Sequence, residues 1–442
     1  MIRKIIISSI IVANIFFSSD KATLNWESLS LEEKIGQMIM VRVNGNYYHS
    51  DSNYQKKIKK WISEYNVGGV ITFSGSIHGT FYNIKKFQSW SSIPLFVAAD
   101  YERGLGQWMD SATLFPSNMA IAATSDSNNA FDQGVIISSE AKSIGVNIIL
   151  APVLDINNNP DNPIINFRAY SDDVNMVSKF GNSFINGIQK NNIFSCVKHF
   201  PGHGNTSIDS HSSLPSIPGS REELLKNELL PFKKAIANGV KMVMVGHIAM
   251  PGLDNSNRPA SHSKKITTDL LRKEWGFEGI IITDGMEMGG LTKNSWAGES
   301  AIRAVESGCD ILLLPMDIKA TIEALLEAVY NGRISVERIN KSVDRIWKAK
   351  QELSLFSQAG IEWSELENNI GNKEYYRTAN NIATKSITIV KDKNNLVPIK
   401  PEKIKKLTHV LLSLDDGAND VLKPFHSEIN RIHHNVDKIF IN

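Results

Sequence analysis

The 442-residue sequence predicts an α/β fold in which eight parallel strands form a (β/α)8 TIM-type barrel. Short apolar runs without polar alternation recur along the chain, and such runs are typical of strands buried on both faces of a parallel sheet. Stretches with helical periodicity separate these runs, so strand and helix alternate. Polar or charged residues follow most of the runs directly, where the carboxyl ends of barrel strands gather at one rim.

The predicted strands are, in chain order, Met38–Val43, Gly69–Phe73, Leu95–Ala99, Val146–Ala151, Phe194–Val197, Met242–Val245, Gly279–Thr283 and Asp310–Leu314. The predicted helices between them are Asn128–Ile144, Val174–Lys190, Glu222–Asn238, Lys264–Trp275, Ser300–Ser307 and Ile318–Tyr330. Gly145, Gly239 and Gly308 fall just past helical stretches, where C-terminal caps are found. These glycines support the predicted helix ends.

A second set of elements is predicted beyond the eighth strand–helix unit. It consists of a helix at Ser335–Leu355, a polar linker at Phe356–Asn372, a helix at Tyr375–Thr384, strands at Ser386–Val390 and Lys406–Leu414, a helix at Val421–Ile432 and the start of a strand at Ile439–Asn442. So few strands do not form a stable α/β domain alone. Either the chain is a piece of a longer protein, or the tail packs onto the barrel. The expected boundaries are a signal peptide over 1–22, the barrel over 23–355, a linker and helix over 356–385, and an incomplete α/β domain over 386–442.

The composition argues against a nucleic-acid partner and against a disulfide framework. The chain has 48 basic and 46 acidic residues, and no basic stripe, which argues against a nucleic-acid partner. The two cysteines, Cys196 and Cys309, lie in or beside apolar runs and are predicted to be buried rather than part of a disulfide framework.

The first residues are typical of a secretory signal. Met1–Lys4 is positively charged, Ile5–Phe17 is apolar, and Ser18 and Ser19 follow. The apolar run is too short to span a bilayer, so no integral membrane segment is expected. The alternative is a buried first strand or helix. We expect an exported bacterial protein, periplasmic or secreted.

Polar residues at the ends of the predicted strands mark the candidate site. They are Asn44, Ser74, Asp100, Asp155, Lys198, His199, His247 and Asp284. Any one of these could cap a strand. Their convergence at one rim, with three carboxylates and two histidines among them, favours an active site.

The most informative stretch is the loop that follows the fifth predicted strand. Lys198 and His199 close the apolar run, and glycines and a proline then open a loop that carries Asp209 and His211. A histidine with a carboxylate partner titrates near neutral pH and can pass a proton in both directions. Two alternatives are a metal site, because His199, His203, Asp209 and His211 are ligand types, and a loop whose polar residues are merely solvated. The histidines lack helical ligand spacing, so no metal is expected.

A carboxylate faces this loop across the predicted barrel. Asp284 follows the seventh apolar run and precedes Gly285, which allows a ligand to approach closely. Strands five and seven are separated by one strand, so the loop with His211 could close over Asp284. A nucleophilic carboxylate about 5–5.5 Å from a proton donor is typical of retaining glycosidases. Here a His–Asp dyad would replace the usual second carboxylic acid.

These motifs resemble glycoside hydrolase family 3, specifically its β-N-acetylglucosaminidase branch. The branch pattern Lys-His-Phe-Pro-Gly-His-Gly, four residues, then Asp-x-His is matched without a gap at 198–211. Further resembling segments are 94–117, 145–155, 159–168 and 269–284. The resemblance covers about residues 26–400. It implies that residues 386–398 lead into the α/β sandwich domain of longer members, cut short here, with a possible further domain beyond residue 442.

The resemblance also implies residue roles. Asp284 would be the nucleophile, His211 the general acid–base and Asp209 its partner. The residues implied to bind sugar hydroxyls are Asp100, Arg168, Lys198 and His199. No cofactor is implied. One departure is clear: the family usually reads Asp-x-Glu-Gly-Gly with an arginine a few residues on, whereas Trp108 stands near that arginine's place here.

The expected function is that of a retaining exo-β-N-acetylglucosaminidase. Its substrate would be an oligosaccharide or muropeptide, from which it releases terminal N-acetylglucosamine of peptidoglycan-derived or chitin-type sugars. Within the same family, a β-glucosidase or an N-acetylglucosaminide phosphorylase are alternatives. From a different class, the chain could be a catalytically silent sugar-binding module, because fold alone does not fix function.

Overall fold

The computed structural model describes residues 24–210, 212–292, 296–357, 360–398, 400–413 and 422–441. The chain divides into two compact units, Met1–Ile387 and Thr388–Asn442, which are described separately below. The predicted signal peptide over 1–22 and the predicted acid–base residue His211 lie outside the described residues.

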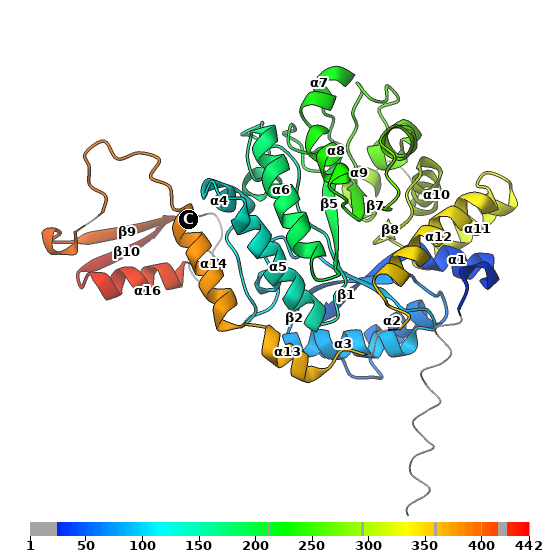
Figure 1. Cartoon of the computed structure of the whole chain (residues 1–442), viewed down its shortest axis with the longest axis horizontal. Coiled ribbons are helices and arrows are strands. Elements are labelled where there is room, and N and C mark those ends of the chain that lie inside the picture. Colours follow the sequence, from blue (N-terminus) through cyan, green and yellow to red (C-terminus); the bar gives the residue numbers. More distant parts are fainter. Residues whose placement is uncertain are drawn as a thin grey trace, which may run out of the picture. The chain divides into compact units, whose positions relative to one another are not determined.

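The first unit is built around a sheet of eight parallel strands (Figure 1). The strands are β1 Ile39–Gly45, β2 Gly69–Gly75, β3 Phe96–Ala99, β4 Ile148–Ile149, β5 Phe194–Phe200, β6 Met242–Val245, β7 Ile280–Thr283 and β8 Leu312–Leu313. Their order is β7-β6-β5-β4-β3-β2-β1-β8, and a parallel bridge between Ile282 and Ile311 connects the two ends. The predicted (β/α)8 barrel is therefore confirmed.

Helices surround the strands (Figure 1). They are α1 Leu31–Gln37, α2 Asn53–Ser63, α3 Ile77–Trp90, α4 Asn118–Ala123, α5 Asn128–Ser143, α6 Val174–Gln189, α7 Arg221–Lys226, α8 Leu230–Ala237, the π-helix η6 Lys265–Glu274, α9 Gly289–Thr292, α10 Ala297–Ser307, α11 Ile318–Tyr330, α12 Val336–Glu352, α13 Trp363–Asn369 and α14 Lys373–Ser386. The 3-10 turns are η2 Trp26–Ser28, η3 Leu105–Gln107, η4 Asn166–Arg168 and η5 Ala260–His262. Side-chain caps determine where several of these helices begin. At the start of α12, for example, Ser335 Oγ accepts the Arg338 N–H.

The core lies inside the barrel and between its strands and helices. Strands β3, β6 and β7 are buried along their whole length, as the continuous apolar runs predict. Burying one such Val, Ile or Leu side chain contributes about 1.5–3 kcal/mol. Cys196 and Cys309 are buried free thiols, which confirms that they act as small apolar residues.

Two predictions within the barrel need correction. Lys198 and His199 do not follow the fifth strand but lie within β5, which continues to Phe200, and all seven of its residues are buried. The single helix predicted at Glu222–Asn238 is two helices, α7 and α8, because the backbone leaves helical geometry at Asn227 and Pro231 favours a new helix start.

Two predictions in the segment after α12 were also wrong. The stretch Phe356–Asn372, predicted as a linker, contains α13, whose Leu366 is buried against the barrel core. The predicted strand at Ser386–Val390 is absent: α14 continues to Ser386 and residues 387–390 are irregular. Burial of one face of α14, through Ala379 and Ile382, explains why the helix extends to Ser386.

The second unit is small. It contains the turn η7 Pro401–Lys403, strand β9 Leu407–Leu412, helix α16 Lys423–Ile432 and strand β10 Val436–Ile441. The two strands pair in parallel, with Val436 opposite Leu407 and Ile441 opposite Leu412. Apolar side chains of this pair, such as Leu412 and Ile439, remain exposed. Across the described residues of both units, no helix combines the length and the apolar character needed to cross a membrane.

Candidate active site

The carboxyl ends of the barrel strands enclose a cavity of about 260 Å³. Five predicted site residues line it together: Asp100, Arg168, Lys198, His199 and Asp284. His203 and Ser210, from the loop after β5, also line the cavity, as do Arg42, Phe73, Glu287 and Met288. Asp209 is half-buried in the same loop but is not among the lining residues.

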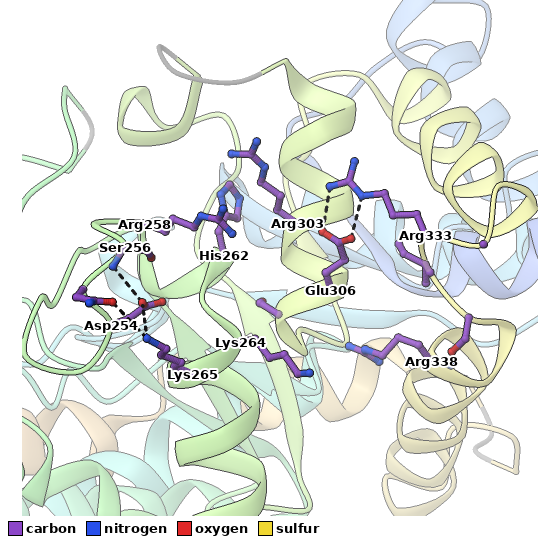
Figure 2. A pocket seen from close by; sticks show the side chains of 15 residues that line it. Asp254, Ser256, Arg258, His262, Lys264, Lys265, Arg303, Glu306, Arg333 and Arg338 are labelled. Carbon is purple, nitrogen blue, oxygen red and sulfur yellow. Dashed lines mark hydrogen bonds and ion pairs between the residues drawn. The ribbon is translucent and has the colours of Figure 1, made fainter.

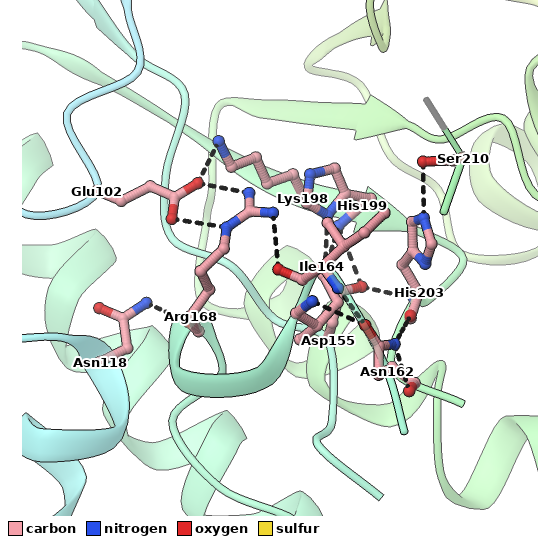
Figure 3. A network of polar contacts seen from close by, with 12 residues as sticks. Glu102, Asn118, Asp155, Asn162, Ile164, Arg168, Lys198, His199, His203 and Ser210 are labelled. Atoms are coloured by element: carbon pink, nitrogen blue, oxygen red, sulfur yellow. Dashed lines mark hydrogen bonds and ion pairs between the residues drawn. The ribbon is translucent and has the colours of Figure 1, made fainter. Parts of the chain in front are cut away.

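A buried charge network forms one wall of the cavity (Figure 3). The Lys198 side chain is only 3% exposed, and its Nζ pairs with Asp100 and, at 2.7 Å, with Glu102 Oε1. Arg168 donates from Nε and from its terminal nitrogen to the two oxygens of Glu102, at 3.0 and 2.7 Å. Glu102 therefore bridges two cations and fixes both, because a bidentate arginine–carboxylate pair also sets the orientation of the guanidinium.

The protonation states in this network follow from the same contacts. Burial alone would raise the pKa of Glu102, but Lys198 and Arg168 outweigh it and hold that pKa far below its usual range. Burial would likewise lower the pKa of Lys198, but Asp100 and Glu102 raise it. Both groups are consequently charged at neutral pH, and two carboxylates balance two cations before any ligand arrives.

A second network orients His199 (Figure 3). Its Nδ1 lies 2.7 Å from Asp155 Oδ2, and the fully buried Asp155 carboxylate also accepts the backbone N–H of His203 at 2.7 Å. Burial would raise the pKa of Asp155, but the His199 ring and the hydrogen bonds lower it, so the carboxylate is ionised. Because an ionised carboxylate can only accept, Nδ1 of His199 carries the proton and Nε2 is the ring nitrogen available to a ligand.

Asp284 lies directly after β7, and its backbone N–H donates to Val245 O at 2.9 Å. Its Oδ1 accepts the Gly285 N–H at 2.8 Å, which orients the carboxylate. Burial would raise the pKa of Asp284, but His199, His247, the Gly285 N–H and Lys198 together lower it. The cavity therefore holds an ionised carboxylate at the barrel rim.

His247 supports the backbone at this point. Its Nε2 lies 3.1 Å from Gly285 O and its Nδ1 lies 2.9 Å from Ser261 Oγ. A carbonyl can only accept, so Nε2 carries the proton, and burial lowers the pKa of His247 so that the ring is neutral. The neutral ring fixes Gly285, and with it the donor to Asp284.

The loop after β5 is anchored at its base. Asn162 Nδ2 donates to the carbonyls of His203 and Gly204 at 2.8 and 2.7 Å, and His203 Nε2 lies 2.8 Å from Ser210 Oγ. Gly204 is required there, because a Cβ would lie 1.7 Å from Ile156 O. The Asp209 carbonyl accepts the Ser212 N–H at 3.0 Å.

Trp108, which stands near the place of an arginine in the usual family pattern, lies beside Asp100 and Phe73 of the cavity. Its Nε1 donates to Asp100 O at 2.9 Å, and its ring meets Phe73 edge-on, with centroids 5.7 Å apart. The Arg42 guanidinium lies over the Phe73 ring, 4.3 Å from its centroid, and pairs with Glu287. Trp108 thus positions Asp100 through the backbone, while Arg42 brings a cation from β1.

Sequence reasoning missed part of the site. Glu102 was given no role, and Asp155 and His247 were named only as strand-end residues, yet each directs a neighbouring side chain or backbone group. The available signal was the position of Lys198 directly after an apolar run, since a lysine buried there requires carboxylates around it. Among the described residues, no group of three or more His, Cys, Asp or Glu side chains is placed to hold a metal ion.

A (β/α)8 barrel with a cavity of charged side chains at the carboxyl ends of its strands has the architecture of a barrel enzyme. Residues 30–349 match the glycosyl hydrolase family 3 N terminal domain. The chain belongs to glycoside hydrolase family 3 and is an enzyme that acts on O-glycosyl bonds.

Relatives agree with this assignment. Beta-hexosaminidase A of Pseudoalteromonas piscicida is 30% identical over 428 residues, covering 87% of this chain and 71% of that protein. A solved glycoside hydrolase family 3 beta-N-acetylglucosaminidase from Paenibacillus sp. str. FPU-7 superposes with a TM-score of 0.84 at 33% identity, covering 94% of this chain and 80% of that chain. The structure of beta-glucoside phosphorylase BglX bound to 2FGlc gives a TM-score of 0.87 at 27% identity. The match covers 93% of this chain and 76% of that chain. The resemblance to the β-N-acetylglucosaminidase branch is confirmed.

Proposed function

We propose that this protein is a retaining exo-β-N-acetylglucosaminidase. The observation that carries the proposal is one cavity that holds the ionised, oriented Asp284 carboxylate together with the charge network of Lys198, Arg168 and Asp100. A hydrogen-bonding set of this kind suits the hydroxyls of a single terminal sugar. The nearby relatives named as hexosaminidases support the N-acetylglucosamine preference.

In the first step of this mechanism, Asp284 attacks the anomeric carbon and forms a covalent glycosyl-enzyme while the glycosidic oxygen leaves. The bond from Gly285 N–H to Oδ1 restrains the carboxylate, so it is oriented before substrate binds. The lowered pKa of Asp284 keeps it unprotonated and nucleophilic at neutral pH.

His211 donates the proton to the leaving oxygen, then takes a proton from water as that water attacks the glycosyl-enzyme. Asp209 would orient and charge the imidazole, as the spacing in the loop suggests. Support comes from the anchoring of the neighbouring Ser210 to His203, which ties this part of the loop to the cavity.

Asp100, Arg168, Lys198 and His199 bind the hydroxyls of the terminal sugar. Asp100, Glu102 and His199 Nε2 offer acceptors, while Lys198 and Arg168 offer donors. Because these groups are already paired with one another, binding costs little reorganisation.

The decisive experiment is to trap the nucleophile with a 2-fluoro N-acetylglucosaminide analogue whose deglycosylation is slow, followed by peptide mapping. We expect a covalent adduct on Asp284, and Asp284→Asn should lose nearly all turnover. An adduct on Glu102, Asp155 or Glu287 would show that the nucleophile is assigned wrongly. Comparing 4-nitrophenyl N-acetylglucosaminide with the matching glucoside tests the sugar preference in the same preparation.

Phosphorolysis is the second candidate, favoured by the similarity to a solved beta-glucoside phosphorylase. A histidine acid–base does not repel phosphate as a second carboxylate would, and Arg42 brings a further cation to the cavity. Turnover in the presence of phosphate distinguishes the two reactions: hydrolysis yields N-acetylglucosamine, whereas phosphorolysis yields its 1-phosphate.

We further propose that the chain is exported, with residues 1–22 as its signal, and that its substrates derive from peptidoglycan or chitin-type sugars. Residues 386–442 would begin a second α/β domain, which the parallel β9–β10 pair and α16 support. N-terminal sequencing of protein from the native host should find a start after about residue 18–24. Retention of Met1 would contradict export by cleavage.

A further inference from the structure

A second hollow, separate from the active-site cavity, lies against η6, α10 and the start of α12 (Figure 2). It encloses about 800 Å³ and shares no lining residue with the active-site cavity. Its size is within the range of ligand sites. Its lining includes six cationic side chains: Arg258, Lys264, Lys265, Arg303, Arg333 and Arg338. Among the described residues that line it, two are acidic, Asp254 and Glu306.

Both carboxylates are already engaged. Asp254 accepts from Ser263 Oγ at 2.6 Å and from the Ser256 N–H at 3.1 Å, and Lys265 Nζ lies 3.4 Å away. Glu306 receives two hydrogen bonds from Arg333, at 2.9 and 3.0 Å. Neither carboxylate remains to neutralise the other cations of the hollow.

Two cations of the hollow consequently have no carboxylate partner among the described residues. They are Arg258 and Lys264, and both side chains are exposed to the hollow. Among the described residues, Arg303 pairs with Glu299 through its Nε, at 2.7 Å, and its terminal nitrogens have no hydrogen-bond partner. Arg338 also lines the hollow, donates to the carbonyls of Val305 and Cys309, and lies 4.0 Å from Asp310 Oδ1.

A buried nitrogen atom of His262, which lines the same hollow, has no hydrogen-bond partner within the described part of the chain. His262 is 7% exposed, and the nitrogen is its Nε2. Figure 2 shows its ring between the side chains of Arg258 and Arg303. Burial lowers the pKa of His262 to about 3, and the nearby Arg303 and Arg258 act in the same direction, so the ring is neutral at neutral pH. An orphan imidazole between two arginines is a costly arrangement without a ligand.

We propose that this hollow binds a polyanion that carries two or more phosphate groups. Arginine forks pair with phosphate oxygens through two parallel N–H bonds, and lysine adds a point charge. The cations are spread along a hollow too large for a single phosphate, which favours an oligophosphate or a phosphodiester chain. A neutral glycan would leave the excess charge uncompensated.

The test measures binding by isothermal titration calorimetry at low and moderate salt. The probes are inorganic tripolyphosphate, a synthetic poly(glycerol phosphate) oligomer and poly-glutamate of matched charge. The variant is Arg258→Ser with Lys264→Ser, two exposed positions whose change should not disturb folding. The matched control is Lys56→Ser with Lys59→Ser, which removes the same charge from exposed positions of α2.

We expect saturable binding of a phosphate probe at one site, weakened at least ~10-fold in the Arg258/Lys264 variant and unchanged in the control. Turnover of a chromogenic N-acetylglucosaminide should be the same in all three proteins, which separates this proposal from the proposed function. Tighter binding of the polymer than of tripolyphosphate would identify a phosphodiester chain as the source, and the reverse would identify a free oligophosphate. Absence of saturable phosphate binding, equal weakening in both variants, or preference for poly-glutamate would each overturn the proposal.

Discussion

Lys350 provides a direct test of how the barrel tolerates a buried amine. This α12 residue is 0% exposed, its Nζ donates to Gln37 Oε1 at 2.7 Å, and the Phe96 ring centroid lies 5.1 Å away. No carboxylate among the described residues pairs with it. Burial lowers the pKa of Lys350 from 10.5 to about 7. The charged amine is therefore disfavoured in the folded state by roughly 5 kcal/mol.

The sign of the pH dependence follows from proton counting. Between pH 7 and 10.5 the unfolded chain holds a proton on this amine that the folded chain lacks, so stability rises with pH across this window. Integrated from pH 7 to 9.5, the contribution of Lys350 amounts to about 3 kcal/mol. Below pH 7 both states are protonated and the contribution becomes constant.

The perturbation is Lys350→Met, with the free energy of unfolding measured in urea from pH 6.5 to 9.5. At pH 7 the variant should be more stable, because the penalty for the charge outweighs the lost bond to Gln37, worth about 1–3 kcal/mol. By pH 9.5 the advantage should vanish or reverse. Lys348→Met is the matched control, since that lysine lies on the same helix with its side chain 71% exposed. A stability difference independent of pH would refute the reasoning, because Lys350 would then keep an ordinary pKa.

Three further predictions concern the active site and the domain boundary. His211→Ala should lower the rate of hydrolysis of a natural disaccharide by about 10²–10⁴-fold. The same variant should retain most of its activity on dinitrophenyl glycosides, whose leaving group needs no proton. Asp209→Asn should cause a smaller loss of activity on the disaccharide. Equal loss on both substrates would mean that the histidine only binds sugar. Glu102→Gln removes the carboxylate that bridges two buried cations, so kcat/KM should fall roughly 10²-fold, and unchanged steady-state kinetics would exclude its positioning role. A chain ending at Ile387 should remain folded and active, whereas one ending at Leu355 should lose thermal stability, as a melting curve would show, because it lacks the buried face of α14.

The barrel could be predicted because its strands are buried on both faces. The apolar run Met242–Val245 coincides with β6, and Ile318–Tyr330 coincides with α11. The local sequence pattern was sufficient to locate these elements. A strand that is buried on both faces has a continuous apolar sequence, so its ends are clear. The split of Glu222–Asn238 into two helices was not predictable from periodicity, since the apolar spacing continues across the break.

The site was predictable in its residue types but not in its pairings. Lys198 was expected at a strand end, and its burial inside β5 depends on Asp100 and Glu102, which come from a distant part of the chain. The role of Asp155 as the partner of His199 likewise requires knowing which strand ends are neighbours. Side-chain pairs across the barrel depend on the tertiary structure, so they cannot be predicted from a local stretch of sequence.

The anchoring of the loop after β5 has a consequence for loop grafting between family members. Its base depends on residues outside the loop: Asp155 holds the His203 N–H, Asn162 holds two loop carbonyls, and Ile156 O leaves space only for Gly204. The loop is therefore not a transferable module by itself. A chimaera that imports residues 201–213 would have to import 155–162 as well, and recombination between these two segments would separate parts that function only together.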